Sequence, residues 1–242
     1  MVLCISIEGL IGAGKTTLIE QVVAALRARG KKVAYASEPV KTWEEVGALK
    51  LFYKNPPRYA YTFQTFTYIT RVKQIIKACQ AVPDVEILIT ERCPYTDRNI
   101  FMELQRAIVT KEEMVMYDMW CDFWLDYLPE DLREGFKCGS ARAIYLRPSI
   151  EACMARVTER ARAGEVEGVP EEYQLQLYEA HEAYLCGKGR DKFPEMPPTP
   201  FSDVRLVEGD RADHDFRVTD AGASEETKTL VKELCDFIVG RD

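Results

Sequence analysis

The chain of 242 residues is 47% hydrophobic and 29% charged, a composition typical of globular proteins that leaves room for a full core. Its formal net charge of −7, with no basic tail, argues against a nucleic-acid polymer as a partner. No apolar run approaches the roughly 20 residues of a membrane span, so we expect no membrane partner. No targeting peptide precedes the first predicted strand, so we expect a cytoplasmic protein, with a nuclear location as the alternative.

Apolar runs alternate with helical patterns along the chain. The predicted strands are Val2–Glu8, Lys32–Ala36, Val85–Glu91, Ala141–Arg147 and Val204–Glu208. The predicted helices are Lys15–Arg29, Thr42–Lys54, Arg58–Gln80, two between Pro94 and Leu128, Ser149–Ala163, Glu171–Lys188 and Glu225–Val239. This alternation predicts an α/β fold in which a five-stranded parallel sheet carries helices on both faces. We expect residues 1–242 to form one domain.

The segment between the first strand and the first helix carries the most specific motif. Residues 9–16, Gly-Leu-Ile-Gly-Ala-Gly-Lys-Thr, match the phosphate-binding pattern G-x-x-x-x-G-K-[ST]. Glycines let backbone N–H groups surround phosphates, and the N-terminus of the following helix adds partial positive charge. Lys15 should reach the β- and γ-phosphate oxygens of ATP, and the Thr16 hydroxyl should ligate Mg²⁺. The predicted ATP-binding residues of this loop are Gly9, Gly12, Ala13, Gly14, Lys15, Thr16 and Thr17.

The loop indicates the phosphate donor, and Glu38 indicates the acceptor. The chain has no N-K-x-D guanine pattern, and a single loop of this kind in a small protein favours a small-molecule kinase. Glu38 follows the second predicted strand, whose carboxyl end borders the same crevice as the loop. A hydroxyl acceptor must lose a proton, which a carboxylate can take, whereas a phosphate acceptor calls for Arg or Lys. Glu38 therefore favours a nucleoside over a nucleotide as the acceptor.

The third predicted strand ends in Glu91, and Arg92 follows it. A carboxylate in this place can position Mg²⁺ or its waters. Arg92 could hold both the acceptor oxygen and the transferring phosphoryl group. The alternative is a buried ion pair without a catalytic part.

Three groups of residues then occur in a linked order. They are Glu38-Pro39-Val40 with Trp43, Phe63-Gln64-Thr65 with Arg71, and Glu91-Arg92-x-x-Tyr95-x-Asp97-Arg98 with Phe101. Together they resemble the deoxyribonucleoside kinase family, and within it most closely the deoxycytidine and deoxyguanosine kinase group. The similarity runs from Val2 to about Leu185. It implies a P-loop kinase fold and transfer of the ATP γ-phosphate to the 5′-hydroxyl of a deoxyribonucleoside, a step of nucleotide salvage, with Mg²⁺ accompanying ATP.

The resemblance implies roles for the residues of a nucleoside pocket. Glu38 would be the general base on the 5′-hydroxyl, assisted by Arg92. Tyr53 would hold the 3′-hydroxyl, and Gln64 would pair with the edge of the base. The apolar walls would be Leu49, Phe52, Phe63 and Phe101, with Trp43 closing one side. Independently of the resemblance, Gln64 and Arg71 are seven residues apart, so they share one face of a helix.

Arg71 and Asp97 are expected to decide which base is accepted. In the family, thymidine-preferring members tend to have smaller or apolar residues at these positions. An Arg–Asp pair can donate and accept at an amino or keto edge but crowds the thymine methyl group. We therefore expect deoxycytidine, deoxyadenosine or deoxyguanosine over thymidine. The alternatives are a thymidine-preferring kinase and a nucleoside monophosphate kinase of the thymidylate type.

Arginines at the end of the helix after the fourth strand are expected to form a lid over ATP, at about residues 156–170. Arg156 and Arg160 are four residues apart and share a helix face, and Arg162 follows them. Their guanidinium groups would stabilise charge on the transferring oxygens, although such spacing also suits a solvated helix face. The family has a lid glutamate for the 3′-hydroxyl. Counting from Arg162 assigns it to Glu165, with Glu167 as the alternative.

Two further features bear on packing and assembly. Cys93-Pro94 stands where relatives usually have a serine and no proline, and we expect the Cys93 thiol to be inert packing. The helices predicted between Pro94 and Leu128 resemble those of the family's homodimer, so a homodimer is expected.

Overall fold

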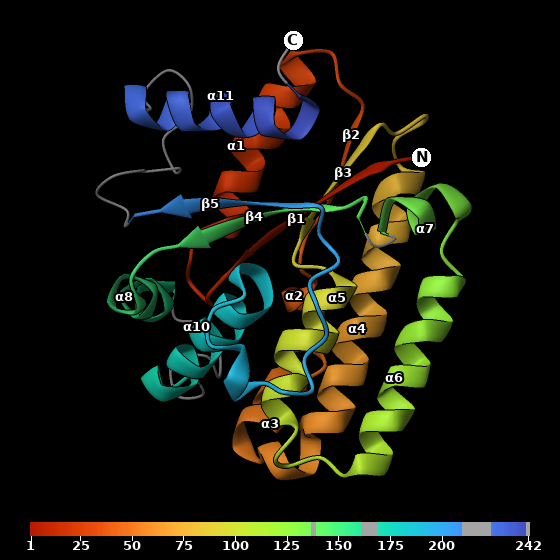
Figure 1. Cartoon of the computed structure of the whole chain (residues 1–242), viewed down its shortest axis with the longest axis vertical. Helices are drawn as coiled ribbons and strands as arrows, with labels where there is room; N and C mark the ends of the chain where they lie inside the picture. The colour runs from red at the N-terminus through yellow and green to blue at the C-terminus, as the bar shows by residue number, and fades with distance from the viewer. Residues whose placement is uncertain (137–138, 161–168, 210–223, 241–242) are drawn as a thin grey trace.

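A five-stranded, wholly parallel sheet forms the centre of the computed structural model (Figure 1). The structure describes residues 1–136, 139–160, 169–209 and 224–240. The strands are β1 (Leu3–Gly9), β2 (Val33–Ala36), β3 (Ile87–Glu91), β4 (Arg142–Arg147) and β5 (Asp203–Glu208), in the order β2-β3-β1-β4-β5. The predicted α/β fold with a five-stranded parallel sheet is confirmed.

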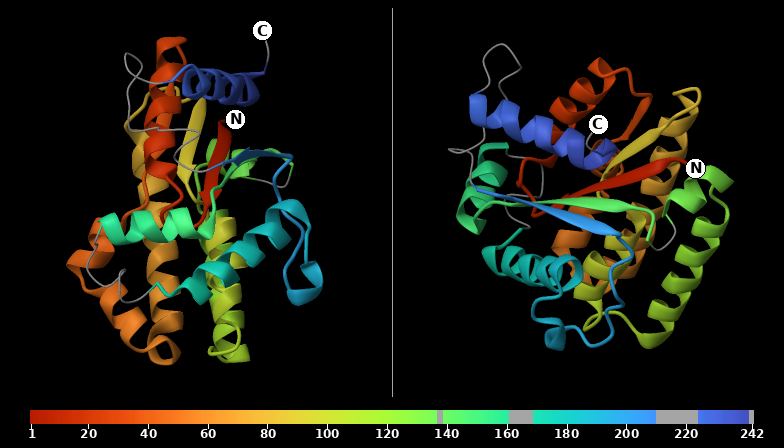
Figure 2. Two further views of the ribbon diagram at one scale, coloured as in Figure 1. Left: turned by 90° about the vertical axis from the view of Figure 1, so that its left-hand side faces the viewer. Right: turned by 45° about the horizontal axis from the view of Figure 1, so that its top comes forward.

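Helices cover both faces of this sheet. They are α1 (Lys15–Ala28), α2 (Val40–Glu45), α3 (Ala48–Lys54), α4 (Pro56–Gln80), α5 (Pro94–Thr96), α6 (Lys111–Asp126), α7 (Glu130–Phe136), α8 (Ile150–Arg160), α10 (Glu171–Cys186) and α11 (Glu225–Val239). A π-helix occupies Asp97–Phe101, and 3₁₀-helices occupy Glu103–Gln105 and Arg190–Lys192. Helices α1 and α11 lie together on one side of the sheet, whereas α4 and α10 lie on the other, with α6 beside α4 (Figure 1, Figure 2). Among the described residues, no helix combines the length and the apolar character needed to cross a membrane.

Burial on both faces follows from the strand sequences. Leu88 and Ile89 are both fully buried although consecutive strand residues point to opposite faces. The main hydrophobic cluster includes Val2 at the start of the chain and Ile238 in α11, so the first and last parts of the sequence share one core.

The strand order brings three chain segments to one edge of the sheet. Strand β3 lies between β2 and β1, with Ala36 opposite Thr90 and Ile7 opposite Glu91. The phosphate loop after β1, the segment with Glu38 after β2 and the segment after β3 therefore leave the sheet side by side. This arrangement is what the sequence predicts for the catalytic crevice.

The helix predicted at Thr42–Lys54 is instead two helices, α2 and α3. The chain breaks at Gly47, whose φ of 71° lies in the left-handed region that favours glycine. The resulting turn allows Trp43 of α2 and Leu49 of α3 to pack in one small hydrophobic cluster, apart from the main core.

The region predicted as two helices between Pro94 and Leu128 is less regular than expected. Pro94 begins the short helix α5, which passes directly into the π-helix, where the Met102 N–H donates to the Asp97 carbonyl at 2.9 Å. Such π-helical turns are frequent at functional sites. After α6, the sequence pattern does not predict α7, because the seven residues of α7 are too few to show a clear helical period.

Candidate active site

Two glycines hold the phosphate loop close to neighbouring backbone. A Cβ at Gly12, whose φ is 84°, would lie 2.4 Å from the Cys153 carbonyl oxygen. A Cβ at Gly9 would lie 2.6 Å from the Leu146 carbonyl oxygen. Only glycine fits such approaches, so these two positions fix the loop against α8 and β4.

Lys15 is buried at the base of this loop, where its Nζ donates to the Leu10 carbonyl oxygen at 2.9 Å. Burial, together with the charge of Arg92, lowers the pKa of Lys15 to about 8, although nearby carboxylates oppose the shift. A buried ammonium group held by neutral carbonyls is well suited to exchange them for phosphate oxygens.

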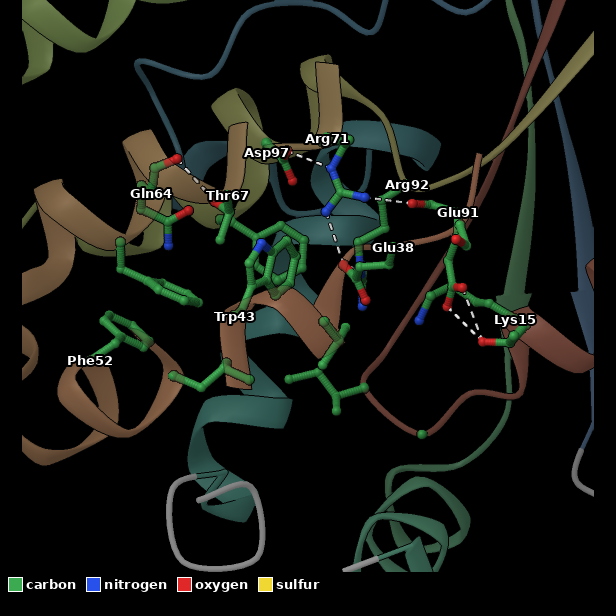
Figure 3. A pocket seen from close by; sticks show the side chains of 18 of the residues that line it. Lys15, Glu38, Trp43, Phe52, Gln64, Thr67, Arg71, Glu91, Arg92 and Asp97 are labelled. Carbon is green, nitrogen blue, oxygen red and sulfur yellow. Dashed lines mark hydrogen bonds and ion pairs between the residues drawn. The ribbon is translucent and has the colours of Figure 1, made fainter. Parts of the chain in front are cut away.

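Arg71 of α4 joins the segments that leave the sheet. Its Nε donates to Asp97 Oδ2 at 2.6 Å, its Nη1 to the Glu91 carbonyl oxygen at 2.6 Å and its Nη2 to Glu38 Oε1 at 2.9 Å (Figure 3). These three acceptors occupy the fork of donors that a guanidinium presents. Arg71 therefore fixes the Glu38 carboxylate relative to the end of β3.

Glu38 is kept ionised by its neighbours. Burial by itself would raise the pKa of this carboxyl group, but the charges of Arg71, Arg92 and Lys15 together lower the pKa to about 2. The side chain is a carboxylate throughout the neutral range, and it lines the cavity in front of the phosphate loop. It can accept a proton or a hydrogen bond there, but it cannot donate one.

Arg92 has an unusual backbone conformation, and its buried head group makes long contacts. Its φ of 61° lies in the left-handed region, which is rare for a non-glycine residue and occurs mainly where the fold enforces it. The Arg92 Nε lies 3.4 Å from Glu38 Oε1, and the guanidinium lies over the Phe101 ring at 4.5 Å from its centroid. The buried charge therefore faces the cavity with long contacts.

The cavity runs from the phosphate loop to a group of aromatic rings. It contains about 920 Å³ of space not filled by protein atoms, part of it open to solvent, a size suited to a small ligand. At the far end the Phe52 and Phe63 rings stack with centroids 4.7 Å apart, and Trp43 meets Phe63 edge-on at 6.0 Å. The Gln64 side chain points into this end of the cavity (Figure 3).

Most of the residues predicted from sequence meet in this one cavity. Its lining includes the predicted residues Gly12, Lys15, Thr16, Glu38, Trp43, Leu49, Phe52, Tyr53, Phe63, Gln64, Arg71, Glu91, Arg92, Asp97, Phe101 and Arg160. The shared helix face of Gln64 and Arg71 is confirmed, since both are buried on α4 and reach the cavity. The roles assigned to these residues stay predictions.

The remaining predicted residues are placed differently. Gly9, Ala13, Gly14 and Thr17 belong to the loop and the start of α1 without being part of the cavity lining. The Nη1 of Arg156, which is predicted to belong to a lid, donates to the carbonyl oxygens of Gly12 and Ala13, at 3.4 and 3.3 Å, so this arginine contacts the loop backbone. Arg162, Glu165 and Glu167 lie outside the described residues.

The cavity also has lining residues to which the sequence analysis assigns no role, namely Ile11, Ser37, Val40, Thr67 and Tyr173. Helical spacing could have found Thr67, which lies three residues after Gln64 on the same face of α4. Tyr173 carries no comparable signal, because no sequence motif connects α10 with the other lining residues. The Cys93 thiol is fully buried, and burial raises its pKa to about 12, which agrees with the expected inert packing.

The Thr16 hydroxyl and the Glu91 carboxylate form a donor set that fits Mg²⁺. Thr16 Oγ1 lies 3.0 Å from Glu91 Oε2 and 3.1 Å from Oε1. Mg²⁺ prefers such oxygen ligands and is usually held by one or two protein groups together with substrate phosphates. The described part of the chain contains no group of three or more His, Cys, Asp or Glu side chains arranged for a metal.

Comparison with known proteins identifies the family. The family model described as "Deoxynucleoside kinase" matches residues 5–236. The chain belongs to the deoxynucleoside kinase family. The enzyme is therefore a nucleoside kinase, as its sequence motifs suggest.

Vertebrate relatives of this deoxynucleoside kinase match over nearly its whole length. It is 30% identical to "Deoxycytidine kinase 1" of Xenopus laevis, over 97% of this chain and 89% of the relative. It is 29% identical to the deoxycytidine kinase of Homo sapiens, over 97% and 90% of the two chains. It is likewise 29% identical to "Deoxyguanosine kinase, mitochondrial" of Xenopus laevis, over 98% and 89%. The predicted resemblance to the deoxycytidine and deoxyguanosine kinase group is confirmed.

A further buried carboxyl group lies just before the loop. Glu8 on β1 is fully buried and accepts hydrogen bonds from the hydroxyls of Ser6 and Thr96, the latter at 3.1 Å. Its Oε2 has no hydrogen-bond partner in the described part of the chain. Burial raises the pKa of Glu8 to about 7, although the charge of Arg92 opposes the shift.

This raised pKa predicts a pH-dependent contribution to stability. In the unfolded chain Glu8 ionises near its usual pKa of 4.5, so the folded state binds more protons between pH 4.5 and about 7. Wild-type stability should fall across this window relative to Glu8→Gln, which cannot ionise, by about 3 kcal/mol in total. Urea unfolding of both proteins at pH 5, 6, 7 and 8 measures the difference. A gap that stays constant across these pH values would contradict the shifted pKa.

Proposed function

We propose that this deoxynucleoside kinase transfers the γ-phosphoryl group of ATP to the 5′-hydroxyl of deoxycytidine, deoxyadenosine or deoxyguanosine in preference to thymidine. The observation that carries the proposal is that one cavity joins a phosphate-binding loop to an aromatic slot, with Glu38 between them. A nucleoside has the matching shape, a flat base with polar edges next to a sugar hydroxyl. Its 5′-hydroxyl would then lie at the Glu38 carboxylate while its base enters the aromatic slot.

The proposed reaction is a direct displacement at phosphorus. Glu38 takes the proton of the 5′-hydroxyl as the oxygen forms a bond to the γ-phosphorus of ATP. The bond from this phosphorus to the β,γ-bridging oxygen breaks, and ADP leaves with the electron pair. The depressed pKa of Glu38 in the free enzyme means that the residue is in the form able to accept this proton.

Cationic side chains surround the position of the transferring group. Lys15 and Arg92 line the cavity beside Glu38, and Arg160 approaches from α8. Fixed positive groups in a partly buried site stabilise the charge that develops on phosphoryl oxygens. Thr16 and Glu91 would hold Mg²⁺, which when bound supplies charge neutralisation on the ATP phosphates. We propose that Arg156, Arg160 and Arg162 form the lid that binds ATP. In the free enzyme Arg156 donates to the carbonyl oxygens of the phosphate loop.

A nucleoside monophosphate kinase is less well supported by the same geometry. An acceptor phosphate needs cations at its binding position. The Arg71 guanidinium is engaged by Asp97, the Glu91 carbonyl and Glu38. The place for an acceptor next to the phosphate loop therefore holds the Glu38 carboxylate and an Arg71 guanidinium that already donates to three protein oxygens.

Replacing the proposed base tests the mechanism. Glu38→Gln keeps the size of the side chain and removes its capacity to take a proton, so kcat should fall by about 10²–10⁴-fold. The dissociation constant for the nucleoside should change much less, because the aromatic slot is untouched. Steady-state kinetics and calorimetric titration measure the two quantities.

A matched control for this substitution is Glu45→Gln, an exposed glutamate on the neighbouring helix α2. Its kcat should stay within about twofold of the wild-type value. An undiminished kcat in Glu38→Gln would remove Glu38 from the role of general base.

The base preference rests on polar groups that line the cavity at its aromatic end and in its middle (Figure 3). Gln64, Arg71 and Asp97 are all buried, and the Arg71–Asp97 ion pair holds the two charged groups in a fixed position. A pocket with fixed donors and acceptors rejects a ligand that leaves them unpaired. The relatives named deoxycytidine and deoxyguanosine kinases support the same preference. We propose that Tyr53 binds the 3′-hydroxyl of the nucleoside, together with Glu165, which lies outside the described residues.

A kinetic panel tests this preference. With ATP and Mg²⁺ as cosubstrate, one of deoxycytidine, deoxyadenosine and deoxyguanosine should give the highest kcat/KM, and thymidine should not. A coupled assay of ADP release measures all four nucleosides under the same conditions. Thymidine as the best substrate would reverse the assignment of Arg71 and Asp97.

We also propose that the enzyme is a homodimer that associates through α6. An apolar stripe on this helix is exposed, consisting of Val115, Met116, Met119, Trp120 and Phe123, with Tyr127 just beyond it. Exposed patches of this kind usually mark an interface, and a stripe along one helix suits pairing with its own copy. The family resemblance points to the same helices.

Placing a charge in the centre of the stripe should separate the subunits. Met119, which is 67% exposed, is replaced by glutamate, and light scattering after gel filtration should show a shift from dimer to monomer. Leu175→Glu, at a 47% exposed leucine on α10, is the matched control and should remain dimeric. A dimer that survives Met119→Glu unchanged would place the interface elsewhere.

Two further expectations accompany this proposal. The shared hydrophobic core from Val2 to Ile238 supports residues 1–242 as a single kinase domain. A cytoplasmic location stays a prediction.

A further inference from the structure

We propose that His181 is a positioning residue, which orients the Arg92 guanidinium toward the transferring phosphoryl group. His181 lies on α10, a helix whose sequence gives no catalytic signal. The inference rests on the proposed function, since it assumes that Arg92 acts in the phosphoryl transfer.

The hydrogen bonds of His181 define its tautomer. Its Nδ1 lies 2.7 Å from the carbonyl oxygen of Leu177, and a carbonyl oxygen only accepts, so Nδ1 carries the proton. The imidazole is fully buried, and burial followed by the charge of Arg92 lowers its pKa to about 3. The ring is therefore neutral, and its Nε2 presents a lone pair.

That lone pair faces the proposed catalytic arginine. The Nη1 of Arg92 lies 3.5 Å from His181 Nε2, and the Phe101 ring meets both side chains, edge-on to the imidazole and beneath the guanidinium. The Nε of the same guanidinium lies 3.4 Å from Glu38 Oε1. His181 and Glu38 thus contact two different nitrogens of the Arg92 head group.

The imidazole is itself rigidly held. The Tyr145 ring of β4 stacks on it, with centroids 5.6 Å apart and an interplanar angle of 14°. The next residue, Glu182, accepts a hydrogen bond from Arg147 at 2.8 Å, which ties α10 to the end of the same strand. Gln174 donates to the Ile11 carbonyl oxygen at 2.7 Å, so the helix is also fixed to the phosphate loop. Because α10 is fixed to β4 and to the phosphate loop, His181 gives the Arg92 guanidinium a contact whose position is fixed relative to the core.

A neutral acceptor suits this task better than a carboxylate would. An arginine side chain has many rotamers, and ordering it before the reaction removes an entropic cost from the transition state. A carboxylate at the place of Nε2 would orient the guanidinium but would neutralise much of its charge. Imidazole orients the group without placing a second negative charge beside it, so more of its positive charge acts on the phosphoryl oxygens.

Two substitutions separate the contact to Arg92 from the rest of the residue. In His181→Gln the side-chain amide extends about as far as Nε2 and can still offer an acceptor to Arg92. In His181→Asn the amide ends near the place of Nδ1, so it can still donate to Leu177 but does not reach Arg92. We expect kcat to fall by about 10–100-fold in His181→Asn and by clearly less in His181→Gln, with the KM for nucleoside changed by less than about threefold in both. An unchanged kcat in His181→Asn, or an equal loss in both variants, would overturn the proposal.

A double-mutant cycle shows whether the effect passes through Arg92. Arg92→Ala should lower kcat strongly, and adding His181→Asn to it should cause no further loss. If His181→Asn costs the same factor with and without Arg92, the residue acts independently and the proposal fails while the role of Arg92 stands. If Arg92→Ala alone leaves kcat unchanged, the proposed function of Arg92 fails and the inference falls with it.

Tyr184→Phe provides the control on the same helix. It removes a buried hydrogen bond, that of Asn99 Nδ2 to the tyrosine hydroxyl at 2.8 Å, without touching Arg92. Its kcat should stay within about twofold of wild type even if its melting temperature falls. A kcat loss equal to that of His181→Asn would mean that loosening α10 suffices, which would overturn the specific role of His181.

Discussion

The site depends on one buried guanidinium. Arg71 donates to the carboxylate after β2, to the last carbonyl of β3 and to Asp97 in the π-helix, so a single residue of α4 fixes three segments relative to one another. Removing one member of such a network would leave a buried charge uncompensated, which typically costs several kcal/mol. The same bonds that stabilise this edge of the sheet also place Glu38 and keep it ionised.

The cavity is divided by charge in a way that suits its two substrates. Cationic groups gather next to the phosphate loop, where Lys15 and Arg92 are buried. Aromatic rings from α2, α3 and α4 gather at the other end, and the Arg71–Asp97 pair lies between. The strand order explains why residues from separate parts of the chain line one cavity. Strand β3 lies between β2 and β1, so the segments that follow these three strands leave the sheet at one edge.

Local sequence patterns predict those parts of the site that depend on short-range constraints. The loop from Gly9 to Thr16 combines a strand, a glycine pattern and a helix start, and helical spacing places Gln64 and Arg71 on one face. Patterns do not reveal contacts between distant segments. The three bonds of Arg71, the π-helix at Asp97 and the approach of His181 to Arg92 arise only when separate elements pack. Gly47 is a sequence signal for the break between α2 and α3, but it is not a sufficient one, because a lone glycine in a helical pattern is often tolerated.

The central claim is that the Arg71 network holds Glu38 as a carboxylate ready to accept the proton of a nucleoside hydroxyl. A carbon-13 NMR titration of the Glu38 carboxyl group in the free enzyme tests this claim most directly, with Glu38→Gln used to assign the resonance. The account predicts that Glu38 stays ionised down to about pH 3, with a pKa near 2. A midpoint at or above the ordinary glutamate value of 4.5 would contradict it.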